Sequence, residues 1–200
     1  MTSTLKNTRI ALTFGDAGEN HTGMEMVGKL GKEGSGFTKK DLLNIKSHLD
    51  KLGYNSHFHS FTLKSVFLGG ILIVRNFLGM AEQENLFQEQ IKLEWDQKYW
   101  DTRRKKVLNK HARANILFLE GVEQNPDYEN KKGTIIDSNK LNYFCKFKTH
   151  LIDILTMGLK NDKAKNIICE GNKYFNLNKC GIGYHGDTER RKSHLFKFRR

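Results

Sequence analysis

Proline, paired cysteines and long hydrophobic runs are all scarce in this 200-residue sequence. The single proline is Pro126, and none of the three cysteines stands in a Cys-x-x-Cys pair. An odd number of such cysteines argues against a disulfide scaffold and predicts reduced thiols in an intracellular compartment. The most apolar stretch, residues 66–80, contains Arg75 and is too short to cross a bilayer. Residues 1–6 lack the apolar segment of a signal peptide, so we expect no membrane partner.

Aromatic and basic residues, by contrast, are plentiful. Aromatic residues make up 10% of the chain and hydrophobic residues 38%, which is too much for a disordered protein and enough for one buried core. Lysine and arginine outnumber the acidic residues, and the formal net charge is +12. A field of this sign favours polyanions, nucleic acid above all. The alternative is a basic surface that serves only solubility.

Helices and strands are expected to mix along the chain, without a convincing run of β-α-β units. Helical spacing of apolar residues predicts helices over residues 38–53, 81–110 and 141–159. Short apolar runs predict strands over residues 10–14, 71–74, 116–119 and 134–136, with strand-like residues also at 167–169 and 174–175. The strand at 71–74 would be a central one, and the glycine-rich residues 15–36 would be looped. The sequence therefore predicts an α+β fold in a single domain, residues 1–200.

Two patterns resemble ligand sites but lack a required residue. Residues 23–30 have the glycine and lysine spacing of a phosphate-binding P-loop, but Leu30 stands where Ser or Thr would bind magnesium. His57 and His59 would lie on one face of a strand, but no third metal ligand is near them in the sequence. We therefore interpret the first as a glycine-rich turn and the second as two surface or half-buried histidines.

Positive charge is concentrated between residues 98 and 113, beside the aromatic residues Tyr99 and Trp100. Arginine and lysine bind phosphates and aromatic rings stack on bases, so this stretch is a candidate nucleic-acid-binding region. The alternative is the solvated face of a helix. The residues that would contact nucleic acid are Arg103, Arg104, Lys105, Lys106, Lys110 and Arg113.

The strongest chemical signal in the sequence is a His-x-Asp pattern near the C-terminus, formed by His185 and Asp187. If this segment is a strand, the imidazole and the carboxylate project from the same side. Non-haem Fe(II) oxygenases bind iron through two histidines and one carboxylate, and leave the remaining positions open. His185 and Asp187 would supply two of those three ligands.

The surroundings of this pattern resemble the AlkB-like branch of the 2-oxoglutarate- and Fe(II)-dependent oxygenases. The matching positions are Asn172, Tyr174, a turn through residues 178–180, Ile182, His185, Asp187 and Glu189. The resemblance implies that His185 and Asp187 bind Fe(II) and that Glu189 lies where the substrate binds. It implies that Asn172 and Tyr174 contact 2-oxoglutarate. It also implies that residues from about 164 to 200 begin a double-stranded β-helix, or jelly roll, after a helical and mixed N-terminal region.

Nearly the whole chain also resembles a group of uncharacterised proteins of large DNA viruses and phages. The shared blocks are residues 14–21 with Gly23 and Met24, residues 109–113 with Asn115, residues 126–129, and residues 185–191. This resemblance implies a host cytoplasm or a virion as the setting. It adds no chemistry to the oxygenase interpretation.

The end of the chain departs from the oxygenase pattern. In that family the second iron histidine, and the arginine that binds the far carboxylate of 2-oxoglutarate, lie several strands after the His-x-Asp segment. Only residues 188–200 follow here; His194 is too near Asp187 to be that ligand, and Arg199 and Arg200 would form a basic tail. We therefore expect a truncated oxygenase-like protein, weakly active or inactive alone, or one whose barrel a separate chain completes. The alternative is a basic, non-catalytic nucleic-acid-binding module.

Overall fold

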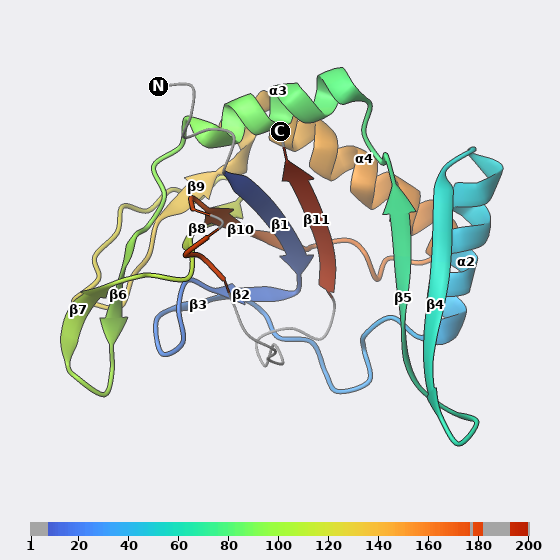
Figure 1. Cartoon of the computed structure of the whole chain (residues 1–200), viewed down its shortest axis with the longest axis horizontal. Coiled ribbons are helices and arrows are strands. Elements are labelled where there is room, and N and C mark those ends of the chain that lie inside the picture. The colour runs from blue at the N-terminus through green and yellow to red at the C-terminus, as the bar shows by residue number, and fades with distance from the viewer. Residues whose placement is uncertain (1–7, 177, 182–192, 200) are drawn as a thin grey trace.

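An open five-stranded sheet forms the centre of the computed structural model, which describes residues 8–176, 178–181 and 193–199 (Figure 1). The strand order is β11-β1-β10-β8-β9, in which all neighbours are antiparallel except β8 and β9. The strands are β1 (Arg9–Gly15), β8 (Ala114–Leu119), β9 (Ile135–Asp137), β10 (Ile168–Tyr174) and β11 (Ser193–Arg199). The α+β class predicted from the sequence is confirmed, and the sheets of the described residues do not close into a barrel.

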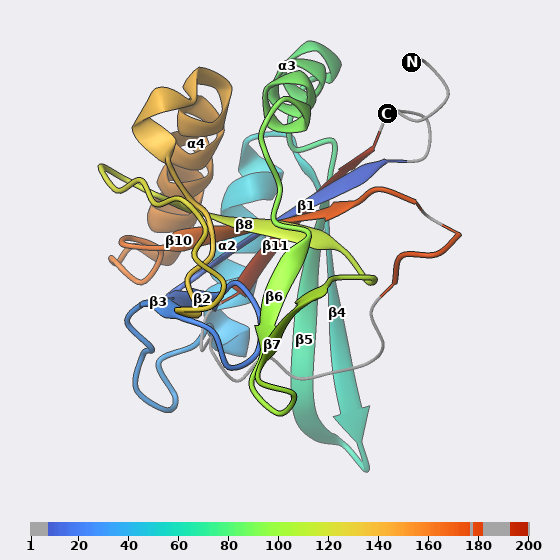
Figure 2. The same cartoon turned by 90° about the vertical axis from the view of Figure 1, so that its left-hand side faces the viewer.

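One face of this sheet is apolar and is covered by helices α3 (Met80–Ile91) and α4 (Asn142–Leu159) (Figure 2). Side chains alternate between the two faces of a strand, so every second residue of β1 and β8 points at the helices. Phe14 and Phe118 both stack on Phe144 of α4, with ring centroids 6.0 and 4.6 Å apart respectively. Burying each of these large apolar side chains stabilises the fold by about 1.5–3 kcal/mol.

Helix α2 (Lys39–Lys51) lies beside α4 and begins where the sequence predicts. The Thr38 hydroxyl accepts a hydrogen bond from the Asp41 amide at 3.1 Å, and the Asp41 carboxylate accepts one from the Thr38 amide at 2.8 Å. This capping box satisfies two amides that the first helical turn would otherwise leave without partners. A second apolar cluster, containing Ile45 of α2 and Leu155 of α4, joins the two helices.

The strand predicted at 71–74 exists, but it is not central. It belongs to β5 (Val66–Arg75), which pairs with β4 (Asn55–Leu63) in a separate two-stranded ribbon that extends beyond α2 (Figure 1). Leu72 and Val74 pack against the α2–α4 cluster, whereas Ile71, on the other face, is 50% exposed. An apolar run shows that a strand is buried on at least one side, but not which sheet it joins.

The helix predicted over residues 81–110 is wrong beyond Ile91. Residues 98–109 instead form an antiparallel hairpin of β6 (Lys98–Asp101) and β7 (Lys106–Asn109). The helix ends where Trp95 turns into the core and its Nε1 donates a hydrogen bond to the Gln90 carbonyl at 3.1 Å. The hairpin turn uses Lys105 in the left-handed region, with φ of 51°, which a helix does not contain.

Two further expectations need correction. The segment 15–36 holds a small ribbon of β2 (Ala17–Glu19) and β3 (Met26–Gly28) rather than loop alone. The expected basic tail is wrong at Arg199, because residues 193–199 form β11, whose register with β1 runs from Gly15–Ser193 to Arg9–Arg199. Backbone pairing along an uncovered strand edge does not depend on side-chain polarity, so a basic segment can fill that edge.

The other predicted elements are confirmed within a few residues. These include α4, β1, β8 and β9, and the two strand-like segments near 170 form one strand, β10. A short 3-10 helix, η1 (Ser138–Lys140), precedes α4. Cys145, Cys169 and Cys180 are free thiols. Among the helices of the described residues, none has the length and apolarity that a membrane crossing requires.

Candidate functional site

The face of the central sheet opposite α3 and α4 is buried, yet it carries polar side chains. Asn115 on β8 and Asn172 on β10 are direct cross-strand neighbours, and Glu170 lies two residues before Asn172. All three are buried, and Glu170 is only 3% exposed. The residues that alternate with them, such as Ile116 and Cys169, belong to the apolar core. Burying polar groups is costly unless they are hydrogen-bonded, so their partners must come from neighbouring segments.

Three loop residues supply polar partners to this face. Asn20 follows β2, Asp96 precedes β6 and Lys110 follows β7, and all three are buried. Figure 2 shows the ribbons β2–β3 and β6–β7 on the side of the sheet away from α3 and α4. The three loop residues and the three strand residues form one group, which we call the polar cluster. It consists of Asn20, Asp96, Lys110, Asn115, Glu170 and Asn172.

The Asp96 carboxylate is the most heavily bonded group of the polar cluster. It accepts hydrogen bonds from the Asn20 amide at 2.7 Å and the Tyr128 hydroxyl at 2.9 Å. The Thr134 amide and hydroxyl add two more, at 2.7 and 2.6 Å. Four donors occupy this carboxylate, so its role is to join segments of the chain rather than to bind a ligand.

Lys110 is a buried cation whose hydrogen bonds go to neutral oxygens. Its Nζ donates to the Asn20 carbonyl at 3.3 Å, to the Asn20 side-chain oxygen at 2.7 Å and to the Asn115 side-chain oxygen. Burial lowers the Lys110 pKa from 10.5 to about 8, although the negative charge of Asp96 acts in the opposite direction. The three donors of the ammonium are all used by these acceptors.

Arg113 lies at the rim of the polar cluster and reaches β10. Its Nε donates a hydrogen bond to the side-chain oxygen of Asn172, and one terminal nitrogen lies 3.7 Å from a Glu170 carboxylate oxygen. The Arg113 side chain is 26% exposed, so part of its guanidinium faces solvent. A planar cation held in this way is suited to bind a carboxylate or phosphate in a two-point contact.

Tyr174 is two residues beyond Asn172 on β10 and belongs to the same face of the strand. Burial raises the pKa of its hydroxyl, and the Arg113 charge opposes that rise in part. The hydroxyl is therefore protonated at neutral pH and can donate a hydrogen bond. Arg113, Asn172 and Tyr174 together define the β10 corner, a group of donors at the end of β10.

The β6–β7 hairpin contacts the loop that carries Asn20 through a ring stack. His21 and Tyr99 have centroids 3.7 Å apart and planes 15° from parallel. Burial lowers the pKa of His21, and the nearby positive charges of Lys110 and Arg113 lower it further. The imidazole is therefore neutral at pH 7. The ring stack holds the basic hairpin next to the polar cluster.

The residues predicted for the site are divided between three places. Asn172 and Tyr174 meet in the β10 corner as described, whereas the predicted iron ligands His185 and Asp187, and Glu189, lie outside the described residues. Among the residues predicted to contact nucleic acid, those at the hairpin turn are exposed and those after it are not. The exposed four are Arg103, Arg104, Lys105 and Lys106. The other two are Lys110, which is buried, and Arg113, which is partly buried.

Sequence reasoning missed most of the polar cluster. A signal existed for Asn115 and Glu170, because each is a polar residue directly beside a short apolar run that predicts a buried strand. No local signal existed for Asn20 and Asp96, which are 76 residues apart in sequence and meet only in the fold. Within the described ranges, no group of three or more His, Cys, Asp or Glu side chains could hold a metal ion.

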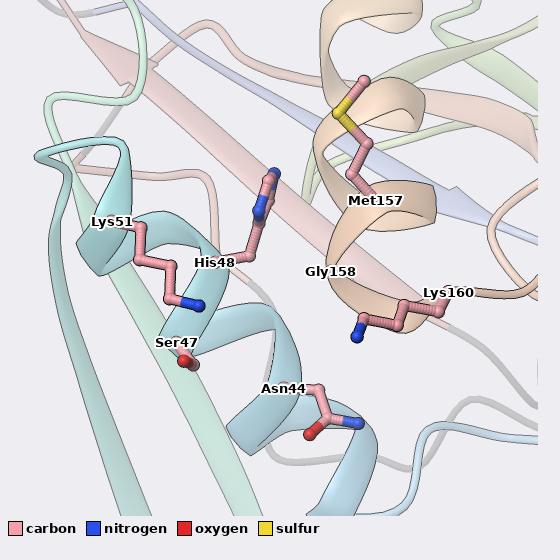
Figure 3. Close-up of a pocket in the computed structure, with 7 residues that line it drawn as sticks. All are labelled: Asn44, Ser47, His48, Lys51, Met157, Gly158 and Lys160. Carbon is pink, nitrogen blue, oxygen red and sulfur yellow. The ribbon is translucent and has the colours of Figure 1, made fainter.

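A shallow groove of about 210 Å³ lies between α2 and α4, away from the polar cluster (Figure 3). Two lysines, Lys51 and Lys160, extend into it from the ends of the two helices. The groove is lined by Asn44, Ser47, His48, Lys51, Met157, Gly158 and Lys160. None of these residues belongs to the polar cluster or to the β10 corner.

Comparison with known proteins places the chain in a viral family. No protein-family model matches the sequence, and no solved structure matches it. A relative among the curated proteins is the "Uncharacterized protein R156" of Acanthamoeba polyphaga mimivirus, which is 33% identical over 190 residues. The match covers 91% of this chain and 70% of the mimivirus protein. The chain therefore belongs to the same family as this mimivirus protein.

Proposed function

We propose that this protein is an oxygenase-like protein that binds Fe(II) and 2-oxoglutarate through β10 and the segment that follows it. The observation that carries the proposal is the β10 corner. The two residues that the oxygenase resemblance assigns to 2-oxoglutarate, Asn172 and Tyr174, share one face of β10, and the Arg113 guanidinium lies against Asn172. Amide, hydroxyl and guanidinium donors are the groups that bind carboxylates.

Each residue of the β10 corner would offer a specific hydrogen-bond donor to a bound carboxylate. The side-chain oxygen of Asn172 already accepts from Arg113, so its amide nitrogen is the group left to donate to a ligand. The Tyr174 hydroxyl is kept protonated because burial raises its pKa, and it is a second donor. Both donors and the guanidinium favour an anionic ligand over a neutral one.

The iron site in this proposal consists of His185 and Asp187 and rests on the sequence alone. Within the described residues, no group of three or more His, Cys, Asp or Glu side chains could hold a metal ion, so the ligands in this proposal are His185 and Asp187. Bound iron, with 2-oxoglutarate and dioxygen, would supply the oxidant that removes hydrogen from a substrate, and Glu189 would lie beside that substrate. We further propose that residues from about 164 to 200, which include β10 and β11, are the first part of a jelly roll.

The test is metal-dependent binding of 2-oxoglutarate. Isothermal titration calorimetry would measure the affinity of the purified protein for 2-oxoglutarate with and without Mn(II), which replaces Fe(II) without turnover. We expect binding that requires the metal and is abolished by His185→Ala and by Asp187→Ala. The matched control is His57→Ala, because His57 is exposed on β4 and far from the site in sequence.

Two results would contradict the oxygenase proposal. One is a lack of 2-oxoglutarate binding by the natural sequence in the presence of Mn(II). The other is a His185→Ala variant that binds 2-oxoglutarate as tightly as the natural sequence does. A folded state of each variant, checked by circular dichroism, is required before its affinity is compared.

A second candidate function is nucleic-acid binding by the β6–β7 hairpin. Its turn presents four consecutive cationic side chains, residues 103–106, and all four are exposed. In the described part of the chain, only Arg104 among them has a carboxylate oxygen within 4 Å, that of Asp101 at 3.8 Å. The neighbouring His21–Tyr99 stack adds aromatic surface beside these charges. The viral relative fits a host cytoplasm or a virion as the setting, where nucleic acid is present.

The test of this second function replaces the four cationic residues of the turn with glutamine. We expect weaker binding of a single-stranded oligonucleotide and a shallower dependence on salt, by about 0.7 in the log–log slope for each phosphate that the variant no longer neutralises. The control variant removes the same charge elsewhere, at the exposed lysines Lys32, Lys51, Lys92 and Lys160. Equal losses of affinity in both variants would show a general charge effect and no hairpin site. Binding should not change in His185→Ala.

A further inference from the structure

We propose that the groove between α2 and α4 binds a tetrahedral dianion of the kind that a phosphate monoester carries (Figure 3). The groove shares no residue with the polar cluster, the β10 corner or the β6–β7 hairpin, so the proposal does not depend on either function proposed above. Its volume of about 210 Å³ lies below the range of about 300–1,000 Å³ for drug-sized ligands. The groove therefore fits one small charged group rather than a whole cofactor.

One wall of the groove is a single face of α2. Asn44, Ser47, His48 and Lys51 follow one another at intervals of three or four residues along the helix, except that Ser47 and His48 are adjacent. Residues at such intervals are neighbours on a helix surface. They bring together an amide, a hydroxyl, an imidazole and an ammonium group. None of the seven described residues that line the groove is acidic, so no carboxylate among them would repel an anion.

The other wall is the end of α4. A Cβ atom at Gly158 would lie 2.9 Å from the Cα atom of Ile45, so the absence of a side chain lets the two helices lie close together and leaves the groove unfilled. Lys160 ends α4 in the left-handed region, with φ of 57°, where glycine is the more usual residue. Lysine at this position supplies an ammonium group that glycine would not.

The side chains of Lys51 and Lys160 enter the groove from its two sides (Figure 3). In the described part of the chain, neither has a carboxylate oxygen within 4 Å, whereas Lys46 of the same face of the fold is paired with Asp50 at 2.6 Å. Two ammonium groups that share a groove repel each other, and an anion between them turns this repulsion into two attractive contacts. The charge of the groove therefore favours an anionic ligand.

His48 gives an observation that is independent of the lysines. Its imidazole lies between the two helices (Figure 3), and its Nε2 atom is buried without a hydrogen-bond partner among the described residues. Buried polar atoms in folded proteins nearly always have a partner, because leaving one without a hydrogen bond is costly. An oxygen atom of a ligand would accept a hydrogen bond from Nε2 in the tautomer that carries its proton there.

The donors of the groove suit a tetrahedral dianion better than a carboxylate. They reach the groove from both walls, which matches oxygens that point in several directions, whereas the two oxygens of a carboxylate lie in one plane. Lysine binds phosphate as a point charge and needs no planar partner. A phosphate monoester carries a charge of about −1.5 to −2 at pH 7, which matches two ammonium groups. A phosphodiester within a nucleic acid chain carries one charge and matches them less well.

The experiment is a nuclear magnetic resonance titration of the full chain with inorganic phosphate. We expect saturable shifts of the backbone amide signals of residues 44–51 and 157–160. Adenosine 5′-monophosphate separates the two sources of the group: equal affinity means that the phosphate alone is recognised, and tighter binding means that a monoester is the better ligand. Acetate at matched ionic strength should not saturate these shifts, and an oligonucleotide without a terminal phosphate should not displace phosphate.

The decisive variant is Lys51→Gln combined with Lys160→Gln. Both lysines are exposed, so we expect the fold to be kept. Phosphate affinity should fall about tenfold or more, which is the size of one charge-assisted contact. The matched control is Lys32→Gln combined with Lys92→Gln, which removes the same charge from exposed positions outside the groove. The control should bind phosphate within about twofold of the natural sequence.

Four results would overturn the proposal. The natural sequence could show no saturable binding of phosphate, or acetate could bind as tightly as phosphate. The two double variants could lose affinity equally, which would show general charge attraction and no site. Finally, the groove variant could lower the free energy of unfolding but keep its phosphate affinity, in which case the two lysines act only as favourable charges at helix C-termini. Loss of affinity in the groove variant alone supports the proposal.

Discussion

Thr134 donates two hydrogen bonds to the carboxylate of Asp96, from its amide to one oxygen at 2.7 Å and from its hydroxyl to the other at 2.6 Å. Asn20 and Tyr128 complete the ring of donors. The four donors come from two separate segments, because Asn20 follows β2 whereas Tyr128 and Thr134 lie in the connection between β8 and β9. Asp96 therefore fixes the loops that surround the polar cluster.

Replacing Asp96 with asparagine should destabilise the protein by about 3 kcal/mol. The new amide would turn an N–H group towards donors that now face a carboxylate oxygen, and it would leave buried groups without acceptors. Urea denaturation of the two proteins measures the change in the free energy of unfolding. Tyr128→Phe, which removes one donor only, should cost about 1 kcal/mol. If Asp96→Asn and Tyr128→Phe lower the free energy of unfolding equally, the Asp96 carboxylate does not join all four donors.

Lys110 should make stability increase with pH between about 8 and 10.5. Its pKa is about 8 in the folded protein, against an ordinary value of 10.5. In this window the unfolded chain holds the proton and the folded chain has lost it, so raising the pH favours the folded state. Below about pH 8 both states are protonated and the cost of burying the charge, about 3 kcal/mol, is constant.

The measurement is the free energy of unfolding at several pH values, compared with Lys110→Met. The methionine keeps the length of the side chain and does not titrate, so subtracting its profile removes the contribution of tyrosines and other groups. The free energy of unfolding of the natural sequence should rise relative to that of Lys110→Met from about pH 8 upwards. A difference that stays flat over this range would show that the Lys110 pKa is not lowered.

Local signals in the sequence located the regular elements well. The helix that begins at Thr38 follows from one threonine and an aspartate three residues later, and the structure contains that capping box. The strands around Phe14 and Ile116 follow from short apolar runs. Asn172 and Tyr174 could be grouped from the sequence because residues i and i+2 of a strand share one face, but their contact with Arg113, 59 residues away from Asn172, could not.

Features that depend on contacts between distant segments could not be predicted from the sequence. Trp95 and Trp100 lie in a helical pattern, but the first turns into the core and the second belongs to a hairpin, so tertiary packing outweighs the periodicity. The polar cluster joins Asn20 to Lys110 across 90 residues. Nothing in the neighbourhood of either residue indicates the other.

Glu89 of α3 caps the N-terminus of α4, and its loss should cost about 1–2 kcal/mol. Its carboxylate accepts hydrogen bonds from the Tyr143 amide at 2.9 Å and the Phe144 amide at 2.8 Å. The residue at the N-cap position, Leu141, has no side chain that could do this. We expect Glu89→Ala to show the full loss in urea denaturation, and Glu89→Gln about half of it, because the amide keeps an acceptor but not the charge.

A control for the Glu89 variants is Asp153→Ala, which removes an exposed carboxylate from α4 itself. Its effect should stay within about 0.5 kcal/mol, as is usual for surface substitutions. If Asp153→Ala and Glu89→Ala lower stability equally, the effect comes from general charge and not from the cap.

Gly158→Ala should destabilise the protein by up to about 2 kcal/mol, although alanine is the better helix former. A methyl group at this position would lie 2.9 Å from the Cα atom of Ile45 on α2. The gain in helix propensity is about 1 kcal/mol, and overpacking against a backbone atom costs about 1–3 kcal/mol because the helix must move as a whole. Thermal and urea unfolding measure the net effect, with Met157→Ala, at a 63% exposed neighbour, as the control. A stabilised Gly158→Ala protein would mean that α2 and α4 can separate at little cost, and the groove between them (Figure 3) would then be adjustable rather than fixed.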